Sequence, residues 1–123
     1  MNLTDAMKQE ILDMHNYQRN YLACGGLKKS VNLKPACRMG VVRWDKELEA
    51  TALLHVTYCT MEHDKCRGTL KYPFSGQNLG YLSGMMLRNL SVYTTLHMYE
   101  WYMEYKLTWP EVVYDYFSKP DNP

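Results

Sequence analysis

The stretch from Cys59 to Tyr81 constrains the fold more than any other part of the chain. Two cysteines, Cys59 and Cys66, stand on either side of His63, and they follow a strongly apolar segment with helical spacing. The sequence Gly76-Gln77-Asn78-Leu79 comes next and predicts a turn that leads into a strand. We therefore expect a helix, a cysteine-bearing loop and a strand to meet here, and we expect the function to reside here.

The four cysteines indicate disulfide bonds more strongly than a metal site. None of Cys24, Cys37, Cys59 and Cys66 belongs to a C-x2-C pair, the usual spacing in a structural zinc site. A Cys24–Cys37 bridge would close a short basic loop and stabilise the fold by roughly 3 kcal/mol. If the apolar helix continued between Cys59 and Cys66, these two would lie too far apart to bridge. We therefore expect at least one of them to have a partner elsewhere.

Hydrophobic spacing predicts a mainly helical chain. Residues suited to begin a helix precede the apolar segments: Thr4, Asp45, Ser91 and Pro110. The second segment is apolar on most sides, which predicts a central helix with His55 as a satisfied core histidine. In the first segment, His15 and Arg19 share one face and are expected to be partly buried and bonded to backbone. The expected helices cover residues 5–23, 46–61, 92–106 and 110–116, and residues 39–44 are expected to be extended.

Charge and hydropathy argue against nucleic-acid binding and against a membrane span. Fourteen basic and thirteen acidic residues leave a net charge of +1, too small to attract nucleic acid over long range. No run approaches the 18 or so consecutive apolar residues of a transmembrane helix. Charged residues near the N-terminus interrupt any apolar core there, so a secretory signal is expected upstream of Met1. The sequons at Asn2 and Asn89 are candidate glycosylation sites.

Five short motifs occur along the chain in the order used by one secreted family. They resemble the superfamily of cysteine-rich secretory proteins, antigen 5 and pathogenesis-related 1 proteins, called CAP, and most of all the antigen 5 proteins of insect venom and saliva. Each motif alone is weak, but five in register are strong evidence of family. The motifs are His15-Asn16-x-x-Arg19, Met39-x-x-x-x-Trp44-Asp45, Cys59-x3-His63-Asp64-x-Cys66, Gly76-Gln77-Asn78-Leu79 and Trp101-x-x-Glu104.

The resemblance implies an α+β fold, a partial α-β-α sandwich that is mostly helical in this chain. A partial CAP domain is expected over residues 3–118, with a tail at 119–123. It would cover the N-terminal two thirds of the family domain, so the C-terminal strands and the second family histidine would be missing. An apolar face would then be uncovered and could mediate self-association. The family's cysteine-bearing N-terminal extension would supply natural partners for Cys59 and Cys66.

The resemblance also places a family cleft at His63, Gln77 and Glu104. Glutamine at position 77 is similar to the antigen 5 variant of a position where many members have glutamate. His63 and Glu104 could bind a divalent metal such as zinc, but they form an incomplete site, because zinc sites use three or four protein ligands. We therefore expect weak zinc binding or none, and no required cofactor.

These features favour a secreted, extracellular, non-catalytic protein that binds a small hydrophobic ligand or a host or self protein. A lipid or sterol ligand is implied by the resemblance alone. Two alternatives remain open at this point. One is a metal-dependent hydrolase that uses His63 and Glu104, and the other is a degenerate, truncated family member without retained activity.

Overall fold

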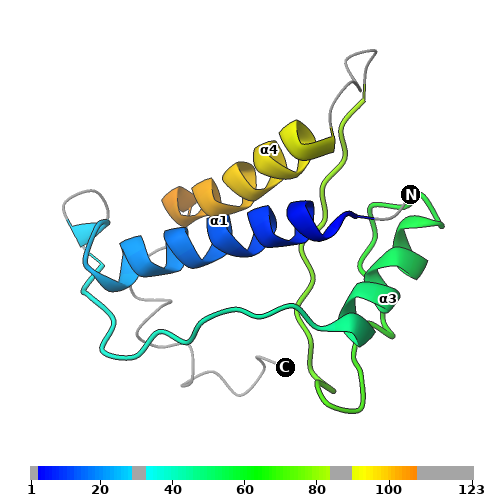
Figure 1. Ribbon diagram of the computed structural model, residues 1–123, viewed down its shortest axis with the longest axis horizontal. Helices are drawn as coiled ribbons and strands as arrows, with labels where there is room; N and C mark the ends of the chain where they lie inside the picture. The colour runs from blue at the N-terminus through cyan, green and yellow to red at the C-terminus, as the bar shows by residue number, and fades with distance from the viewer. Residues whose placement is uncertain (1–2, 29–32, 84–89, 108–123) are drawn as a thin grey trace. The chain divides into compact units, whose positions relative to one another are not determined.

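The computed structural model describes residues 3–28, 33–83 and 90–107 (Figure 1). Along the chain, the elements are α1 (Asp5–Ala23), α3 (Lys46–Val56), α4 (Leu90–Met103) and the 3-10 helix η1 (Glu104–Leu107). The chain divides into two compact units, one of residues 1–42 and 89–123 and the other of residues 43–88. Helices α1, α4 and η1 therefore belong to the first unit, and α3 belongs to the second.

Helix α1 begins and ends where its sequence predicts. Thr4 precedes it with extended backbone, and its hydroxyl accepts a hydrogen bond from the amide of Met7 at 3.3 Å. At the other end Gly25 has a φ of 83°, and the amides of Gly25 and Gly26 donate to carbonyls of the last helical turn. This arrangement favours glycine, because the left-handed backbone is strained for residues with a Cβ atom. A Cβ atom at Gly26 would also collide with the ring of Tyr21.

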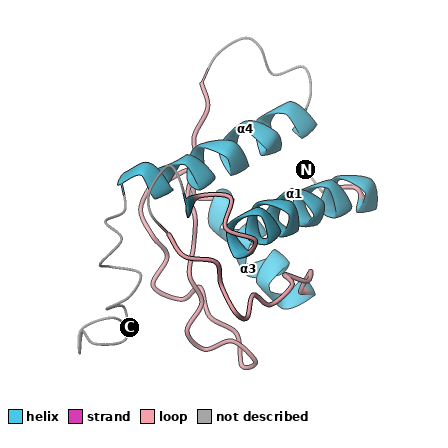
Figure 2. Cartoon of the chain, turned by 90° about the vertical axis from the view of Figure 1, so that its left-hand side faces the viewer, coloured by secondary structure: helices cyan, strands magenta, loops and turns pink. Residues whose placement is uncertain are grey.

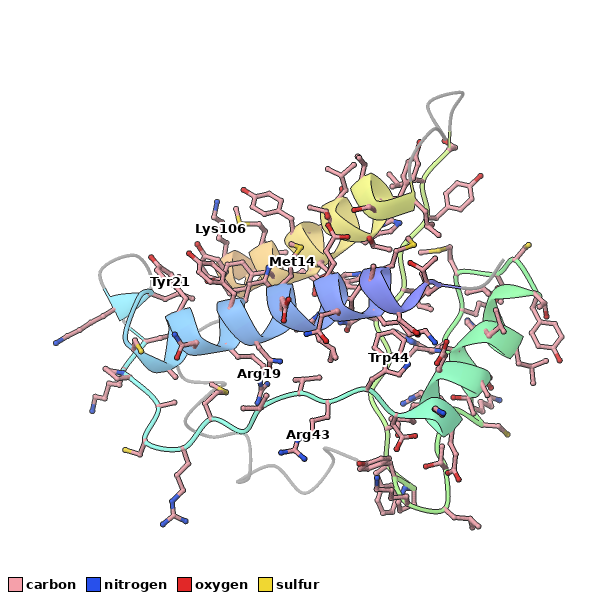
Figure 3. All side chains as sticks on the ribbon, viewed as in Figure 1. Met14, Arg19, Tyr21, Arg43, Trp44 and Lys106 are labelled. Carbon is pink, nitrogen blue, oxygen red and sulfur yellow. The ribbon has the colours of Figure 1, made fainter. Side chains whose placement is uncertain are left out.

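Two polar side chains of α1 fasten the backbone of residues 40–42 to this helix. The amide of Asn16 bonds both backbone groups of Val42, donating to its carbonyl at 3.1 Å and accepting from its N–H at 2.8 Å. Arg19, labelled in Figure 3, donates from Nε and Nη2 to the carbonyl of Gly40 at 3.0 and 2.8 Å. The prediction that Arg19 is partly buried and bonded to backbone is confirmed.

Helices α1 and α4 lie side by side in the first unit (Figures 1 and 2). Met98 of α4 is 3% exposed and forms part of the core. The hydroxyl of Ser91 lies 2.8 and 2.7 Å from the two carboxylate oxygens of Glu10, which ties the start of α4 to α1. His15 is partly buried as predicted, with Nδ1 2.8 Å from the carbonyl of Ile11.

The predicted start of α4 needs correction. The helix already includes Leu90, so Ser91 lies within its first turn and is not a cap residue ahead of it. The Ser91 hydroxyl binds Glu10 across the helix pair, which is why a polar residue is accommodated there. Helix α4 continues as η1 close to the predicted end. The short helix predicted at 110–116 lies outside the described residues.

Helix α3 is shorter and more exposed than predicted. It ends at Val56, short of the predicted end near Met61, because the next amides donate to carbonyls three residues back and Cys59 reaches a φ of 50°. His55 is its buried residue, at 7% exposure, so the predicted burial is confirmed, whereas the prediction that its polar atoms are satisfied is wrong for Nε2 within the described residues. The prediction of a central helix is wrong for the described structure. Large apolar side chains on and after the helix are exposed: Leu53, Leu54, Val56, Tyr58 and Met61.

Residues 76–79, predicted to lead from a turn into a strand, are not paired in a ladder with any described residue. No strand occurs in the described ranges 3–28, 33–83 and 90–107, where loops join the helices (Figure 2). A strand needs a neighbouring strand to bond its backbone groups, and residues 76–79 meet none among the described segments. The helical part of the predicted fold class is confirmed, and the α-β-α sandwich stays a prediction.

Candidate functional site

The loop that follows α3 brings two of the predicted site residues, His63 and Gln77, together. Nδ1 of His63 lies 3.1 Å from Oε1 of Gln77, and the backbone amide of Asp64 donates to the same oxygen at 3.0 Å. The backbone amide of Asp64 can only donate a hydrogen bond, so the Gln77 atom that it contacts must be the side-chain oxygen. That oxygen can only accept, so Nδ1 of His63 must carry the proton of the His63–Gln77 hydrogen bond. The neutral His63 ring therefore keeps its lone pair on Nε2.

The carboxylate of Asp64 holds the turn that carries His63. Its Oδ1 accepts a hydrogen bond from the amide of Cys66 at 2.8 Å, and its Oδ2 lies 3.8 Å from Nδ1 of His55. The other nitrogen of His55, Nε2, is buried and has no hydrogen-bond partner within the described residues. Asp64 thus links α3 to the turn between His63 and Cys66.

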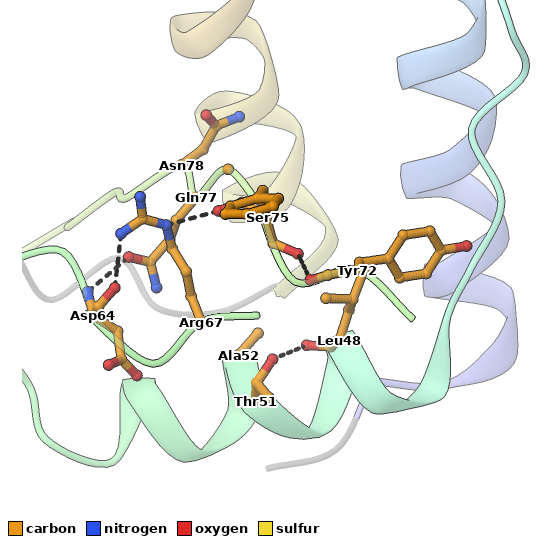
Figure 4. A pocket seen from close by; sticks show the side chains of 11 residues that line it. Leu48, Thr51, Ala52, Asp64, Arg67, Tyr72, Ser75, Gln77 and Asn78 are labelled. Carbon is orange, nitrogen blue, oxygen red and sulfur yellow. Dashed lines mark hydrogen bonds between the residues drawn. The ribbon is translucent and has the colours of Figure 1, made fainter. Parts of the chain in front are cut away.

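A cavity of about 500 Å³ lies between α3 and the residues around Gln77, within the second unit (Figure 4). One wall is apolar and includes Leu48 and Ala52 of α3. Arg67 forms part of the opposite wall, where its Nε donates to the carbonyl of Ser75 at 2.7 Å and its Nη1 donates to the carbonyl of Asp64 at 2.8 Å. These two bonds fix the guanidinium at the cavity.

The start of α3 is anchored by Asp45, its N-cap residue. The Asp45 carboxylate accepts from the amides of Glu47 and Leu48 at 3.0 and 3.2 Å and lies 3.3 Å from the ammonium of Lys71. The hydrogen bond from Leu48, with further contributions from Lys71 and Glu47, lowers the pKa of Asp45. Lys71 also lies 4.8 Å from the ring centroid of Tyr72, which lines the cavity. Through Lys71, the N-cap residue Asp45 therefore links Tyr72, at the aromatic side of the cavity, to the start of α3.

Glu104, the third predicted site residue, is exposed at the start of η1. It belongs to the first unit, whereas His63 and Gln77 belong to the second, so its place in a shared cleft stays a prediction. In the part of the chain that the structure describes, no three His, Cys, Asp or Glu residues are grouped to hold a metal ion. Weak zinc binding through His63 and Glu104 likewise stays a prediction.

All four cysteines are free and exposed in the structure. The amide of Ala36 donates to the carbonyl of Ala23 at 3.2 Å, which brings together the chain segments that contain Cys24 and Cys37. The Cys24–Cys37 bridge stays a prediction that this contact favours. Helix α3 ends before Cys59, so the argument that a continuous helix separates Cys59 from Cys66 no longer applies.

Both candidate glycosylation sites, Asn2 and Asn89, lie outside the described residues. Among the helices in the described ranges, none is both long and apolar enough to cross a membrane.

Arg67 and the cavity beside it were not predicted from the sequence. Arg67 directly follows Cys66, but no motif or spacing distinguishes it from the other basic residues of the chain. Leu48 and Ala52 belong to the apolar segment that predicts a central helix, and its spacing does not distinguish a cavity wall from core packing. The cavity depends on how residues 72–78 fold back toward α3, and sequence spacing does not specify that path.

The family follows from comparison of the whole chain with known proteins. Residues 12–122 match the family described as the cysteine-rich secretory protein family, CAP. The chain therefore belongs to this family, as its five motifs predicted.

Several proteins with similar sequences bear the names of venom proteins or allergens. The chain is 45% identical to the antigen 5 like allergen Cul n 1 of Culicoides nubeculosus over 82 residues, which are 67% of this chain and 36% of the relative. It is 39% identical to venom allergen 5 of Microctonus hyperodae over 109 residues, 86% of this chain and 46% of the relative. It is 36% identical to the cysteine-rich venom protein of Tityus serrulatus over 107 residues, 84% of this chain and 27% of the relative. None of these names states an enzymatic activity.

The chain spans less than half the length of these relatives, so the matched region is one part of each relative. No solved structure matches the chain.

Proposed function

We propose that the chain acts as an extracellular, non-catalytic, antigen 5-like protein that binds a small hydrophobic ligand of the lipid or sterol type. The observation that supports this most directly is the cavity of about 500 Å³ beside Gln77. Ligand pockets in proteins commonly measure about 300–1,000 Å³ and combine apolar walls with a few polar groups. The extracellular location is supported by the venom relatives and by the family.

The contacts of His63 support the non-catalytic part of the proposal. A histidine that acts as a general base is commonly oriented by a carboxylate and bonded to a nucleophile. Nδ1 of His63 is instead bonded to the neutral amide of Gln77. Within the described residues, no serine, threonine or cysteine bonds to this ring. The His63–Gln77 pair therefore acts as a structural link at the edge of the cavity.

A lipid-extract pull-down tests the proposal. The immobilised chain is incubated with a total lipid extract, and the retained small molecules are identified by mass spectrometry. Ala52→Glu places a charged side chain in the cavity wall on α3 and should abolish retention. Ala50→Glu adds the same charge at an exposed position of α3 outside the cavity lining and serves as the matched control. Retention at background level by the unmodified chain would overturn the proposal.

A protein partner is the second candidate, and the exposed apolar side chains of α3 favour it. Leu54 and Val56 are 58% and 63% exposed. Exposed apolar surface is unfavourable in water, and association with a partner would bury it. Light scattering after size exclusion measures the mass in solution. If the chain pairs with itself through this surface, Leu54→Glu should convert a dimer into a monomer of 14.5 kDa, whereas Ala50→Glu should leave the dimer intact.

A further inference from the structure

The charge of Arg67 is not neutralised by any carboxylate within the described residues. Its two hydrogen bonds go to backbone carbonyls, those of Ser75 and Asp64. The Asp64 carboxylate is the acid nearest along the chain, and Figure 4 shows it directed away from the guanidinium. That carboxylate is occupied by the amide of Cys66 and by His55.

This arrangement leaves a half-buried cation beside a hollow. A carbonyl accepts a hydrogen bond from a guanidinium but carries no net charge, so the positive charge remains. Withdrawing such a charge from water is costly unless an anion or further hydrogen bonds compensate. Asp64 also lines the cavity, but its carboxylate is bonded to the amide of Cys66 and lies near His55, and the side chains of Ser75, Gln77 and Asn78 around Arg67 are neutral. Nη2 of Arg67 donates no hydrogen bond to the described residues and is available to a ligand.

The remainder of the cavity wall suits an apolar body. Leu48 and Ala52 line it from α3, and the rings of Tyr72 and Phe74 line it from the loop. Phe74 is 89% exposed, so a large aromatic side chain stands at the cavity with almost no contact to the protein. A ligand that covered this ring would bury apolar area that is now in water.

We propose that the cavity binds a small amphipathic carboxylate, with its carboxylate on Nη2 of Arg67 and its apolar body between Phe74 and the α3 wall. The proposal deepens the proposed function and rests on it, because it names the charge and the class of the ligand. One arginine matches the single charge of a carboxylate. A phosphate dianion would require further cations, and none lines the cavity besides Arg67.

Titration with two aromatic probes of the same shape tests the proposal. The full chain is titrated by calorimetry with 1-naphthoate and with uncharged 1-naphthylmethanol. We expect naphthoate to bind at least about tenfold more tightly, the effect of one charge-assisted hydrogen bond. Equal affinities would overturn the charge recognition and would leave the binding of neutral hydrophobic ligands intact. Absence of binding by both probes would overturn the inference, and the lipid pull-down would still decide the proposed function.

Variants assign the charge recognition to Arg67. Arg67→Met should remove the tenfold preference for naphthoate, and Arg67→Lys should restore part of it. Arg43→Met is the matched control, because Arg43 is exposed in the same unit and does not line the cavity. Phe74→Ala removes an exposed ring that the fold does not need, and it should weaken both probes equally. If circular dichroism shows that Arg67→Met does not fold, the proposal is tested instead by the two-probe comparison on the natural chain and by the effect of Phe74→Ala. A naphthoate preference that persists in folded Arg67→Met would overturn the assignment.

Discussion

Oε1 of Gln77 accepts hydrogen bonds from the ring of His63 and from the amide of Asp64, at 3.1 and 3.0 Å. A neutral amide can therefore fix the tautomer of His63 and close the turn after it without adding a charge. A glutamate at this position would accept the same two bonds. The difference between the two residues lies in the charge that is added beside His63, and not in the hydrogen-bond pattern.

The double role of Gln77 predicts different effects of two substitutions. Gln77→Met removes the acceptor and leaves the Asp64 amide without its partner, which should lower the free energy of unfolding by about 1–2 kcal/mol. Gln77→Glu keeps the acceptor and should leave stability near neutral pH about unchanged. Urea unfolding followed by tryptophan fluorescence measures both. Equal loss in the two variants would show that the side-chain oxygen does not hold the turn.

The N-cap at Asp45 predicts a dependence of stability on acid pH. The folded-state pKa of Asp45 is lowered, first by the hydrogen bond from Leu48 and also by Lys71. A lowered folded-state pKa stabilises the fold above the ordinary value of 3.8, and this stabilisation is lost as the pH falls through the lowered pKa.

Substitution separates the charge of Asp45 from its capping role. Asp45→Asn keeps a good cap without the charge, so it should unfold at lower urea concentration than the natural chain at pH 7 and at nearly the same concentration at pH 2. Asp45→Ala should be less stable than Asp45→Asn at both values. If the urea midpoints of the natural chain and of Asp45→Asn differed by the same amount at pH 7 and at pH 2, the stabilising role of the Asp45 charge would be contradicted.

The hydroxyl of Tyr102 predicts a substitution that does not weaken the fold. This hydroxyl is shielded from water and has no hydrogen-bond partner within the described residues. Its ring packs against that of Tyr105, with centroids 5.2 Å apart. Tyr102→Phe keeps the ring and removes the unpaired group, so the free energy of unfolding should stay the same or rise by up to about 1 kcal/mol. A loss above about 1 kcal/mol in thermal unfolding would indicate that the hydroxyl has a partner.

The same hydroxyl predicts a loss of stability at alkaline pH. Burial, with smaller contributions from Tyr105, Tyr21 and Tyr17, raises the pKa of Tyr102 above 10.0. A raised folded-state pKa stabilises the fold below pH 10 and stops doing so as the pH rises through the raised value. Tyr102→Phe should therefore lose less stability between pH 9 and 11 than the natural chain.

The contact between Ala23 and Ala36 predicts that Cys24 and Cys37 form a bridge in an oxidising compartment. Alkylation without reductant, followed by mass spectrometry of peptides, should find these two thiols protected. Reduction should then lower the free energy of unfolding by roughly 3 kcal/mol. A Cys59→Ser, Cys66→Ser double variant is the control and should keep the protection. Alkylation of Cys24 and Cys37 in the unreduced protein would refute the pairing.

The sequence predicted the first helix well, because its boundaries depend on local chemistry. Thr4 caps it and Gly25 ends it, and both act within one turn of the helix. His55 was correctly placed in the interior for a similar reason, since its neighbours along the helix are apolar. The end of α3 was misjudged because the backbone after Val56 tightens into short turns, and no proline or glycine marks that change.

The candidate site was predicted only in part. The resemblance to the family placed His63 and Gln77 at one cleft, and the hydrogen bond between them is a finding of the structure. The cavity and the role of Arg67 were missed, because both depend on where the chain returns toward α3 and on which carboxylates fail to reach the guanidinium. Both depend on distances between residues that are far apart in the sequence, and the periodicity of apolar residues does not specify such distances.

Native mass spectrometry of the protein secreted by its own cells tests the central claim most directly. We predict that the protein is present in the secreted fluid and carries a noncovalent small molecule that denaturation releases unchanged. A protein that is absent from that fluid, or that is recovered there without any small molecule, would contradict the account.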